Sequence, residues 1–351
     1  MNKLNLAVLF GGQSSEYSVS LHSAGSFLRQ IRQENYNLIL IGIDSDGIFY
    51  LYDGSIEDIE HDTWKKEGSC TPCAFIHKGV ISLEKPEQKI DIDVAFPILH
   101  GKNGEDGCMQ GLLELMNIHY VGCDVMSSAI SMDKEIMHIL CKEANIPCAD
   151  YVCLKKWGDN PSFEEIEAQI PLPWIIKPCN AGSSYGVHKV EKKEDFEDAC
   201  QDAFYYDGRG KILVEKAIEG FEIGCAVMGN ETVFCGSVDE IQIAGSIFDF
   251  EGKYEDKGAD IICPARIDEK QFKEAQTLAY RTYRAMNCTG LARVDMFLTT
   301  EGEVILNELN TIPGFTATSR YPSMMKEAGL TFPDLIDRLI ELAMQRKVGV
   351  C

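Results

Sequence analysis

The chain has 351 residues, which is more than one ordinary compact core holds, so two or three domains that share a cleft are expected. Its composition is that of a globular protein, because 45% of the residues are hydrophobic and 25% are charged. A formal net charge of -22 argues against a nucleic-acid partner or an anionic membrane surface, since both are bound by clustered Lys and Arg. A bound phosphate must therefore meet a few locally placed cations.

The start of the chain does not resemble a secretion signal. Met1 to Phe10 is a short apolar segment that runs directly into glycines, without the basic region and longer apolar core of a signal peptide. No run of about 18 apolar residues follows, so we expect a cytoplasmic protein with no membrane partner. The 14 cysteines are then expected to be reduced thiols. The C-x-x-C pair Cys70 and Cys73 has no second pair or histidines at finger spacing and is weak support for a zinc site.

The first third of the chain alternates between strand-like and helical patterns. Strands are predicted over 4–10, 38–43 and 94–98, and helices over 19–31 and 110–116. Such alternation predicts a parallel sheet flanked by helices, with a cleft at the carboxyl ends of its strands. The N-terminal unit is therefore expected to be an α/β domain.

The pattern changes further along the chain. A helix is predicted over 131–144, where Ser131 stands near the start and Asn145-Ile146-Pro147 ends it. Strands follow on either side of a glycine-rich turn within 174–190, and strands over 212–215 and 222–228 extend this antiparallel pattern. The last third contains a long polar and aromatic connection over 244–264, a helix over 269–286, a hairpin of strands 292–298 and 304–308, and a helix over 332–344.

The clearest chemical signal lies on the two strands of that hairpin. Arg293 and Asp295 are two residues apart on one strand, and Glu308 and Asn310 are two apart on the other. Because side chains alternate along a strand, each pair shares a face. Carboxylate and amide oxygens are the ligands that Mg2+ prefers, together with water and nucleotide phosphates. The arginine supplies a planar charge for a phosphoryl group or an oxyanion. The alternative is an ordinary cross-strand ion pair.

A second segment fits phosphate binding. In 177–186 a lysine ends an apolar strand and precedes a turn of small residues, whose backbone N–H groups can approach phosphate oxygens. The segment is not a Walker A sequence, and alone it is equally compatible with a hairpin turn. Lys134, near a helix start, and the acidic Glu215 and Glu222 complete the set, although a lysine placed like Lys134 is usually solvated surface.

Taken as a set, these residues resemble the ATP-grasp superfamily and, within it, the D-alanine:D-alanine ligase family, in the family's order from residue 10 to residue 322. Further family-like segments are Phe10-Gly11-Gly12-Gln13-Ser14-Ser15-Glu16, 99–107, 251–254 and 310–316. The pair Gly11-Gly12 does not fit the pattern G-x-G-x-x-G, so a dinucleotide site has little support.

The resemblance implies an α/β protein with an α+β ATP-grasp part. Three domains are expected: an N-terminal α/β substrate domain with a parallel sheet over 1–123, a central ATP-grasp subdomain over 124–216, and a C-terminal ATP-grasp domain over 217–351 that carries a lid over 244–264. The resemblance further implies a homodimer that acts in peptidoglycan precursor synthesis.

The implied reaction is an ATP-dependent ligation. The carboxylate of D-alanine attacks the γ-phosphate, and the amine of a second D-amino acid attacks the resulting D-alanyl phosphate, with ADP and phosphate as products. Phosphoryl transfer depends mainly on positioning and charge neutralisation. Two metal ions, Mg2+ or Mn2+, are implied, and the family pattern assigns them to Asp295, Glu308 and Asn310.

The family pattern also implies roles for other residues. The nucleotide would be bound by Lys134, Lys177, Ser184, Glu215, Lys216, Ile218, Glu222 and Lys253. Glu16 would accept the ammonium of the first D-alanine, in a hydrogen-bonded triad with Ser183 and Tyr254. Arg293 and the backbone N–H of Gly314 would stabilise the tetrahedral oxyanion. Closing the lid that carries Lys253 and Tyr254 would exclude water from an acyl phosphate.

The residues expected near the amino acid substrates are His100, Phe250, Ser319 and Arg320. His100 by itself reads as a loop histidine bonded to backbone. Ligases that make D-alanyl-D-alanine commonly carry lid tyrosines where this chain has Phe248 and Phe250, and Thr-Ser-His-Ser-Leu where it has Thr316-Ala317-Thr318-Ser319-Arg320. Ser319 is kept, as expected for a contact with the carboxylate of the second substrate.

The identity of the second substrate follows from these departures. The segment 320–325 resembles the vancomycin-resistance ligases, and 248–254 resembles their D-serine branch. A polar donor in an apolar pocket can favour a serine hydroxyl, so D-serine is the expected second substrate, with Arg320 and Phe250 shaping its site. Ala317 and Thr318 fit neither pattern, and a housekeeping D-alanine:D-alanine ligase is the alternative.

Three rival classes are less well supported. The first glycine segment and the lid sequence speak against a biotin-carboxylase-like or glutathione-synthetase-like ligase. The intact Arg293, Asp295, Glu308 and Asn310 disfavour an ATP-binding regulatory protein without catalysis. A non-enzymatic interaction protein would show exposed apolar patches or charge blocks. Phosphate release that requires both ATP and D-alanine separates the enzyme from these rivals.

Overall fold

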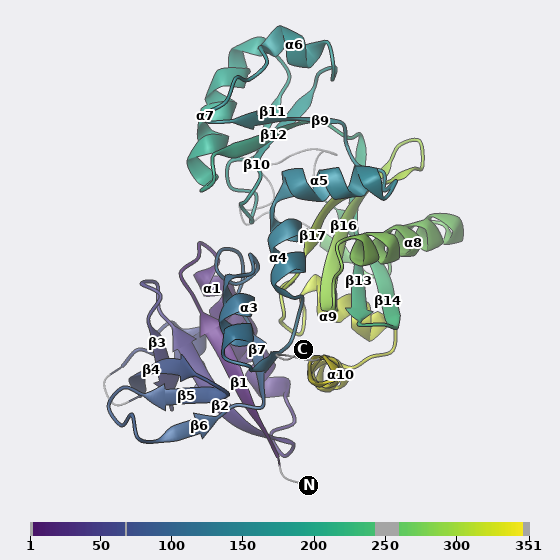
Figure 1. The fold of residues 1–351 in the computed structure, drawn as a ribbon. Coiled ribbons are helices and arrows are strands. Elements are labelled where there is room, and N and C mark those ends of the chain that lie inside the picture. Colours follow the sequence, from purple (N-terminus) through teal and green to yellow (C-terminus); the bar gives the residue numbers. More distant parts are fainter. Residues whose placement is uncertain (1–2, 67–68, 243–259, 347–351) are drawn as a thin grey trace.

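The protein is built around three sheets that occupy separate regions (Figure 1). The computed structural model describes residues 3–66, 69–242 and 260–346. Most of the predicted lid over 244–264 therefore lies outside the described residues. The expected α/β architecture with a parallel N-terminal sheet is confirmed, as the first sheet shows.

The first sheet has eight strands in the order β6-β5-β4-β3-β2-β1-β7-β8. They are β1 (Leu4–Gly11), β2 (Tyr36–Ile43), β3 (Phe49–Tyr52), β4 (Cys70–Ile76), β5 (Gly79–Ser82), β6 (Lys89–Asp91), β7 (Val94–Pro97) and β8 (His119–Tyr120). The strands β2, β1, β7 and β8 run parallel, and the other neighbours are antiparallel. The parallel strands read as continuous apolar runs because helices or other elements cover both faces. The antiparallel strands β3 to β6 lack such runs and were not predicted, and neither was the two-residue β8.

Three helices accompany this sheet: α1 (Tyr17–Gln30), α2 (Ile56–Glu60) and α3 (Cys108–Leu115). The chain leaves β1 through Gly11, whose φ is 87°, and a Cβ there would lie 2.2 Å from the carbonyl oxygen of Ile43. Glycine is required at this close approach. The turn is followed by Glu16, directly before α1, which lines the cleft described below.

The second sheet has four antiparallel strands in the order β11-β10-β12-β9. They are β9 (Tyr151–Lys155), β10 (Trp174–Pro178), β11 (His188–Val190) and β12 (Lys211–Lys216), accompanied by α6 (Phe163–Glu167), η1 (Lys193–Asp195) and α7 (Phe196–Tyr206). This unit has its own apolar cluster around Phe163, Trp174 and Ile176. It forms the upper part of Figure 1.

The helix predicted over 131–144 begins at the wrong residue. The structure has two helices there, α4 (Val125–Met132) and α5 (Lys134–Glu143). Asp133 between them is extended, with ψ at 100°, and its side chain accepts a hydrogen bond from the N–H of Ile136. An aspartate that caps a helix in this way ends one helix and starts the next. Lys134 is consequently the first residue of α5.

The third sheet has five antiparallel strands in the order β15-β14-β13-β16-β17. They are β13 (Gly220–Gly229), β14 (Val233–Gln242), β15 (Asp260–Ile262), β16 (Gly290–Thr299) and β17 (Val304–Asn310), and α8 (Glu269–Ala285), α9 (Arg320–Glu327) and α10 (Phe332–Gln345) pack nearby. The hairpin of β16 and β17 is confirmed. The strand predicted over 222–228 forms part of β13, and it belongs to this sheet rather than to the second one.

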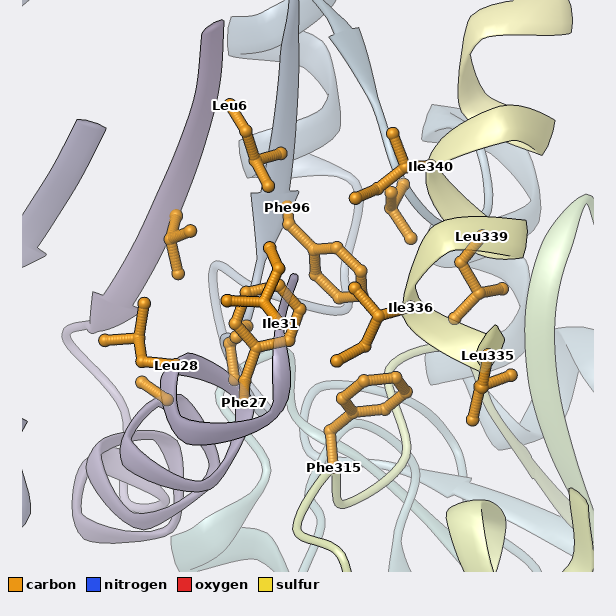
Figure 2. Close-up of a cluster of buried hydrophobic side chains, with 14 of the residues drawn as sticks. Leu6, Phe27, Leu28, Ile31, Phe96, Phe315, Leu335, Ile336, Leu339 and Ile340 are labelled. Atoms are coloured by element: carbon orange, nitrogen blue, oxygen red, sulfur yellow. The ribbon is translucent and has the colours of Figure 1, made fainter. Parts of the chain in front are cut away.

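The first and third sheets share an apolar core (Figure 2). Phe27 and Leu28 of α1 and Phe96 of β7 meet residues from the end of the chain, namely Phe315, Leu335, Ile336, Leu339 and Ile340. The helix α10 thus packs against the N-terminal sheet as well as the third sheet. The domain boundaries at 123 and 216 stay a prediction.

The described cysteines are free thiols. Cys70 and Cys73 both lie on β4, and burial raises the pKa of each thiol. Among the described residues, no group of three or more His, Cys, Asp or Glu is arranged to hold a metal, so the zinc alternative gains no support. Within the same residues, every helix is too short or too polar to span a bilayer.

Candidate active site

A cleft of about 950 Å³ lies where the second and third sheets face each other. Its size is that of a small-molecule binding site. Most of the residues singled out in the sequence line it: Glu16, Lys134, Lys177, Ser183, Ser184, Glu215, Lys216, Ile218, Glu222, Arg293, Asp295, Glu308, Asn310 and Arg320. Phe250, Lys253 and Tyr254 lie outside the described residues. His100, Gly314 and Ser319 do not line the cleft.

The hairpin side chains form the densest cluster. Arg293 lies opposite Asn310, and Asp295 lies opposite Glu308, as strand alternation predicted. The guanidinium of Arg293 donates to Asp295 through Nε at 2.8 Å and Nη2 at 2.6 Å, and Asn310 Nδ2 donates to Asp295 at 2.8 Å. Asp295 is only 1% exposed. The cluster lies midway along β16.

The opposite wall of the cleft carries the lysines. Lys177 on β10 lies 2.8 Å from Glu215 Oε2 and donates to Asn307 Oδ1 at 3.3 Å. Glu215 on β12 also lies 2.9 Å from Nε2 of the buried His138. Burial favours the neutral carboxyl, but Lys177 and His138 together outweigh it and lower the pKa of Glu215 to about 2. Glu215 is therefore ionised. Its contact with His138 was not predicted from the sequence.

Lys134 links this wall to the hairpin. Its Nζ donates to the carbonyl oxygen of Ala181 at 2.9 Å, in the glycine-rich turn, and lies 3.6 Å from Glu308 Oε2. The residue is 8% exposed, so the interpretation as solvated surface is wrong. The break at Asp133 places Lys134 at this point.

The glycine-rich turn also contacts the N-terminal unit. Ser183 Oγ donates to Glu16 Oε1 at 2.5 Å. Ser183 and Ser184 have φ values of 53° and 56°, in the left-handed region that non-glycine residues rarely adopt. Such strain is common where a backbone is shaped for a ligand. Two members of the predicted triad thus meet, and the third, Tyr254, lies outside the described residues.

Arg320 begins α9, and the structure places its guanidinium among carboxylates. It donates to Asp239 through Nε and Nη2 at 2.8 Å each and to Glu222 through Nη1 at 2.9 Å. Nη1 also lies 3.2 Å from Asp295 Oδ1. Arg320 is therefore a counter-ion inside the cleft. Sequence reasoning missed Asp239, because a single aspartate on a strand carries no local signal.

The three predicted residues outside the cleft lining lie beside the N-terminal unit and the start of α9. His100 Nδ1 is 2.9 Å from the carbonyl oxygen of Ile312, and Nε2 is 3.1 Å from Ser23 Oγ, which agrees with a histidine bonded to backbone. Burial lowers the pKa of His100. Ser319 is the N-cap residue of α9, and a Cβ on Gly314 would be 3.2 Å from its hydroxyl oxygen. Their contacts with substrate stay predictions.

Glu105 is a half-buried carboxyl that the sequence did not single out, although its segment 99–107 is family-like. It accepts backbone hydrogen bonds from Gly101 and Ile312 at 3.0 Å each. Burial first, and the charge of Glu16 second, raise the pKa of Glu105 to about 7. Glu105 thereby ties the N-terminal unit to the segment that follows the hairpin.

Comparisons with known proteins cover nearly the whole chain. The family descriptions D-ala D-ala ligase N-terminus and D-ala D-ala ligase C-terminus match residues 5–123 and 140–341. Vancomycin C-type resistance protein VanC1 of Enterococcus gallinarum is 44% identical over 97% of this chain and 99% of its own length. A D-alanine–D-alanine ligase of Caldicellulosiruptor bescii is 41% identical over 99% and 96%.

A solved structure agrees with the fold. The VanG D-Ala:D-Ser ligase of Enterococcus faecalis superposes with a TM-score of 0.91 at 43% identity, covering 97% of this chain and 100% of that one. This likeness extends to all three sheets and confirms the ATP-grasp architecture.

Proposed function

Because the chain belongs to the D-alanine–D-alanine ligase family, we propose that it joins D-alanine to D-serine in an ATP-dependent reaction. The observation that carries the proposal is the cleft itself. Two lysines on one side face two carboxylates and an amide on the other, beside a guanidinium. Such an arrangement suits an anionic nucleotide that arrives with a cation.

The nucleotide has suitable partners in the cleft. Lys134 and Lys177 bring two cations to the cleft, and Lys134 contacts the turn that contains Ser184. We assign the phosphates to this side. Glu215, Lys216 and Ile218 line the neighbouring wall, where the adenine is expected, and Glu222 lies where a ribose can be bound. Lys253 is assigned here on its sequence pattern alone. The volume of about 950 Å³ is large enough for ATP.

The donor set fits Mg2+ better than zinc. Asp295, Glu308 and Asn310 supply hard oxygen atoms, and Asn310 already uses Nδ2 on Asp295, so its Oδ1 faces elsewhere. Among the described residues, no group of three or more His, Cys, Asp or Glu side chains is arranged to hold a metal by itself. Mg2+ commonly binds few protein ligands and completes its shell with water and nucleotide phosphates, which agrees with a set of three side chains. Two ions, Mg2+ or Mn2+, are proposed. The metal would supply charge neutralisation at the transferred phosphate.

The first D-alanine is proposed to bind between Glu16 and Arg293. Glu16 would accept the ammonium, and its hydrogen bond from Ser183 fixes its orientation. Arg293, held by Asp295, is oriented to stabilise negative charge that develops on the amino acid carboxyl, with the N–H of Gly314 as second donor. Tyr254 and the lid are assigned by pattern, and they would exclude water.

The choice of D-serine rests on chain-specific residues. The segment 320–325 resembles the vancomycin-resistance ligases, and two relatives are named for that group or for D-serine. Arg320 was expected to shape the site of the second substrate directly. In the structure, however, its guanidinium N–H groups are directed at three carboxylates. We therefore propose that Arg320 shapes the second site through α9, together with Ser319, His100 and Phe250. The product would enter peptidoglycan precursors and contribute to vancomycin resistance.

A competition assay tests the activity. The purified protein is incubated with ATP, Mg2+ and D-alanine, alone or with D-serine or D-lactate, and products are identified by mass spectrometry while phosphate is measured. We expect D-alanyl-D-serine to form with the highest kcat/KM. The D-serine assignment is wrong if D-alanine gives the highest kcat/KM as second substrate and Arg320→Leu leaves the ranking unchanged. No phosphate release dependent on D-alanine would overturn the ligase proposal itself.

The housekeeping D-alanine:D-alanine ligase remains the second candidate, favoured by relatives such as the Caldicellulosiruptor bescii enzyme. The same assay decides between the two. A homodimer with the three domains 1–123, 124–216 and 217–351 is proposed from the family pattern, and sedimentation equilibrium tests the dimer.

A further inference from the structure

Three carboxylates are aligned in one row across four strands of the third sheet. Asp239 on β14 lies opposite Gly224 on β13, Gly224 lies opposite Asp295 on β16, and Asp295 lies opposite Glu308 on β17. Residues that face each other on neighbouring strands share one face of the sheet. The row therefore continues from the proposed metal ligands to an aspartate that has no assigned role.

Gly224 leaves room for a cation in the middle of this row. A Cβ on Gly224 would lie 2.3 Å from Nη2 of Arg320 and 2.8 Å from Oδ1 of Asp239. Such distances are far shorter than real contacts, so the guanidinium lies directly over the glycine. Asp239 is 0% exposed there, and a buried aspartate without a cation would be costly.

Asp239 determines the direction of the guanidinium. Arg320 uses Nε and Nη2 for a two-point contact with Asp239, at 2.8 Å each, which fixes the plane of the group. This contact leaves Nη1 directed at Glu222 and Asp295, at 2.9 and 3.2 Å. Arg320 is thus a built-in competitor for the two side chains proposed to bind ribose and metal.

We propose that Asp239 is a positioning residue of the metal–nucleotide site. Asp239 neutralises the positive charge of Arg320, so that the negative charges of Asp295 and Glu222 stay available to the Mg2+ nucleotide. The inference rests on the proposed binding roles of Asp295 and Glu222. If Asp239 were neutral, Glu222 and Asp295 would have to compensate Arg320 alone. The metal would then compete with a more strongly held guanidinium, in a site with one negative charge fewer.

The test uses Asp239→Asn, which keeps the shape of the side chain and removes its charge. ADP binding to the full chain is measured by isothermal titration calorimetry over a series of Mg2+ concentrations, without amino acid. We expect the Mg2+ concentration for half-maximal binding to rise about tenfold, a coupling typical of residues in one charge network. An unchanged Mg2+ requirement overturns the inference.

A double variant isolates the contribution of Arg320. Arg320→Met removes the competing cation, so the Mg2+ requirement should fall or stay level. In that background, adding Asp239→Asn should change the requirement by less than about twofold, because Asp239 acts through Arg320 and the effects of residues in one charge network are not additive. An equal shift in both backgrounds would mean that Asp239 acts on the metal site without Arg320, contrary to the inference.

Asp44→Asn is the matched control for a purely structural effect. Asp44 is also buried, at 4% exposure, and is bonded by Lys65 and by backbone N–H groups of the turn between β2 and β3. Its replacement should lower the Tm without changing the Mg2+ requirement. If Asp239→Asn behaves in the same way, Asp239 is only structural and the inference fails.

A second variant covers the case in which Asp239→Asn does not fold. Arg320→Lys keeps the charge but cannot make the two-point contact, so the Mg2+ requirement should again rise; no rise overturns the inference. The binding readout separates this result from the proposed function. A protein that binds Mg2+ and ADP without releasing phosphate on addition of D-alanine would contradict only the ligase assignment.

Discussion

The two walls of the cleft differ in which charge is in excess. On the wall of the second sheet, Lys177 is paired with Glu215, which His138 also contacts, and Lys134 is bonded mainly to backbone. On the wall of the third sheet, the carboxylates outnumber the cations: Glu222, Asp239, Asp295 and Glu308 surround Arg293 and Arg320. One wall can offer positive charge to phosphates, and the other can offer negative charge to a metal.

This excess of opposite charge on the two walls explains why a nucleotide and its cation would be bound together. A nucleotide without metal would meet the lysines but also the surplus carboxylates, which repel phosphate. A metal ion with its phosphates satisfies both walls at once. Changes to either wall should therefore have distinct signatures.

The largest effect is expected from Asp295→Asn on the carboxylate wall. This change removes the charge that holds Arg293 and contributes to the proposed metal set. Phosphate release with ATP and D-alanine should fall by roughly 10³-fold, the size typical of losing one preorganised charged group. The control is Asp260→Asn on the exposed strand β15 of the same sheet, which should retain activity. Equal activity in the two variants would contradict the assignment of this wall.

A large stability effect is expected from Lys177→Met on the lysine wall. The change leaves Glu215, which is 6% exposed, without its main cation. Breaking a buried pair in this way costs about 3–5 kcal/mol of unfolding free energy, measured by urea denaturation. The double variant Lys177→Met with Glu215→Gln should regain part of that stability but not ADP binding. Restored ADP binding would show that this wall does not serve phosphates.

A smaller effect concerns pH. The pKa of Glu215 is lowered from 4.5 to about 2, so its ionised form stabilises the fold above about pH 4.5 and this contribution is lost as pH falls toward 2. Wild type should therefore exceed Glu215→Gln in unfolding free energy by roughly 2–3 kcal/mol near neutral pH. The gap should shrink between about pH 4.5 and 3 in urea titrations. A gap independent of pH would contradict this account of Glu215.

The smallest effect concerns a thiol behind the lysine wall. The contact with the Cys141 thiol and the neighbouring His138 lower the pKa of Cys148, despite its burial. The more exposed Cys108 has a raised pKa, through burial and the nearby Asp106. Cys148 should therefore react with iodoacetamide a few-fold faster at about pH 6.5, as measured by peptide mass spectrometry. Faster reaction at Cys108 would show that exposure alone governs these thiols.

Local patterns predicted the parts of the protein that depend on strand alternation. The hairpin and the shared faces of Arg293 with Asp295 follow from a period of two and a polar turn. The ion pair of Lys177 with Glu215 was not predicted, since these residues lie on different strands and the family resemblance assigned both only to the nucleotide. Periodicity could not place the start of α5, because a capping aspartate at 133 looks like any polar residue within a helix.

The long-range polar contacts could not be read from the sequence. Arg320 meets Asp239 across 81 positions of the chain, and nothing in either segment indicates the other. Glu105 is similar, because its raised pKa depends on burial between two distant loops. Sequence reasoning therefore identified candidate cations and carboxylates of the site, while the structure showed which carboxylate pairs with which cation.

The packing of α10 has a consequence for biosynthesis. The helix supplies Leu335, Ile336 and Leu339 to the core that Phe27 and Phe96 begin. Phe27 and Phe96 are synthesised well before α10, the helix that covers them. Their apolar face therefore stays uncovered until residues 332–345 have been made, and a nascent chain that stalls before residue 332 exposes a surface prone to aggregation.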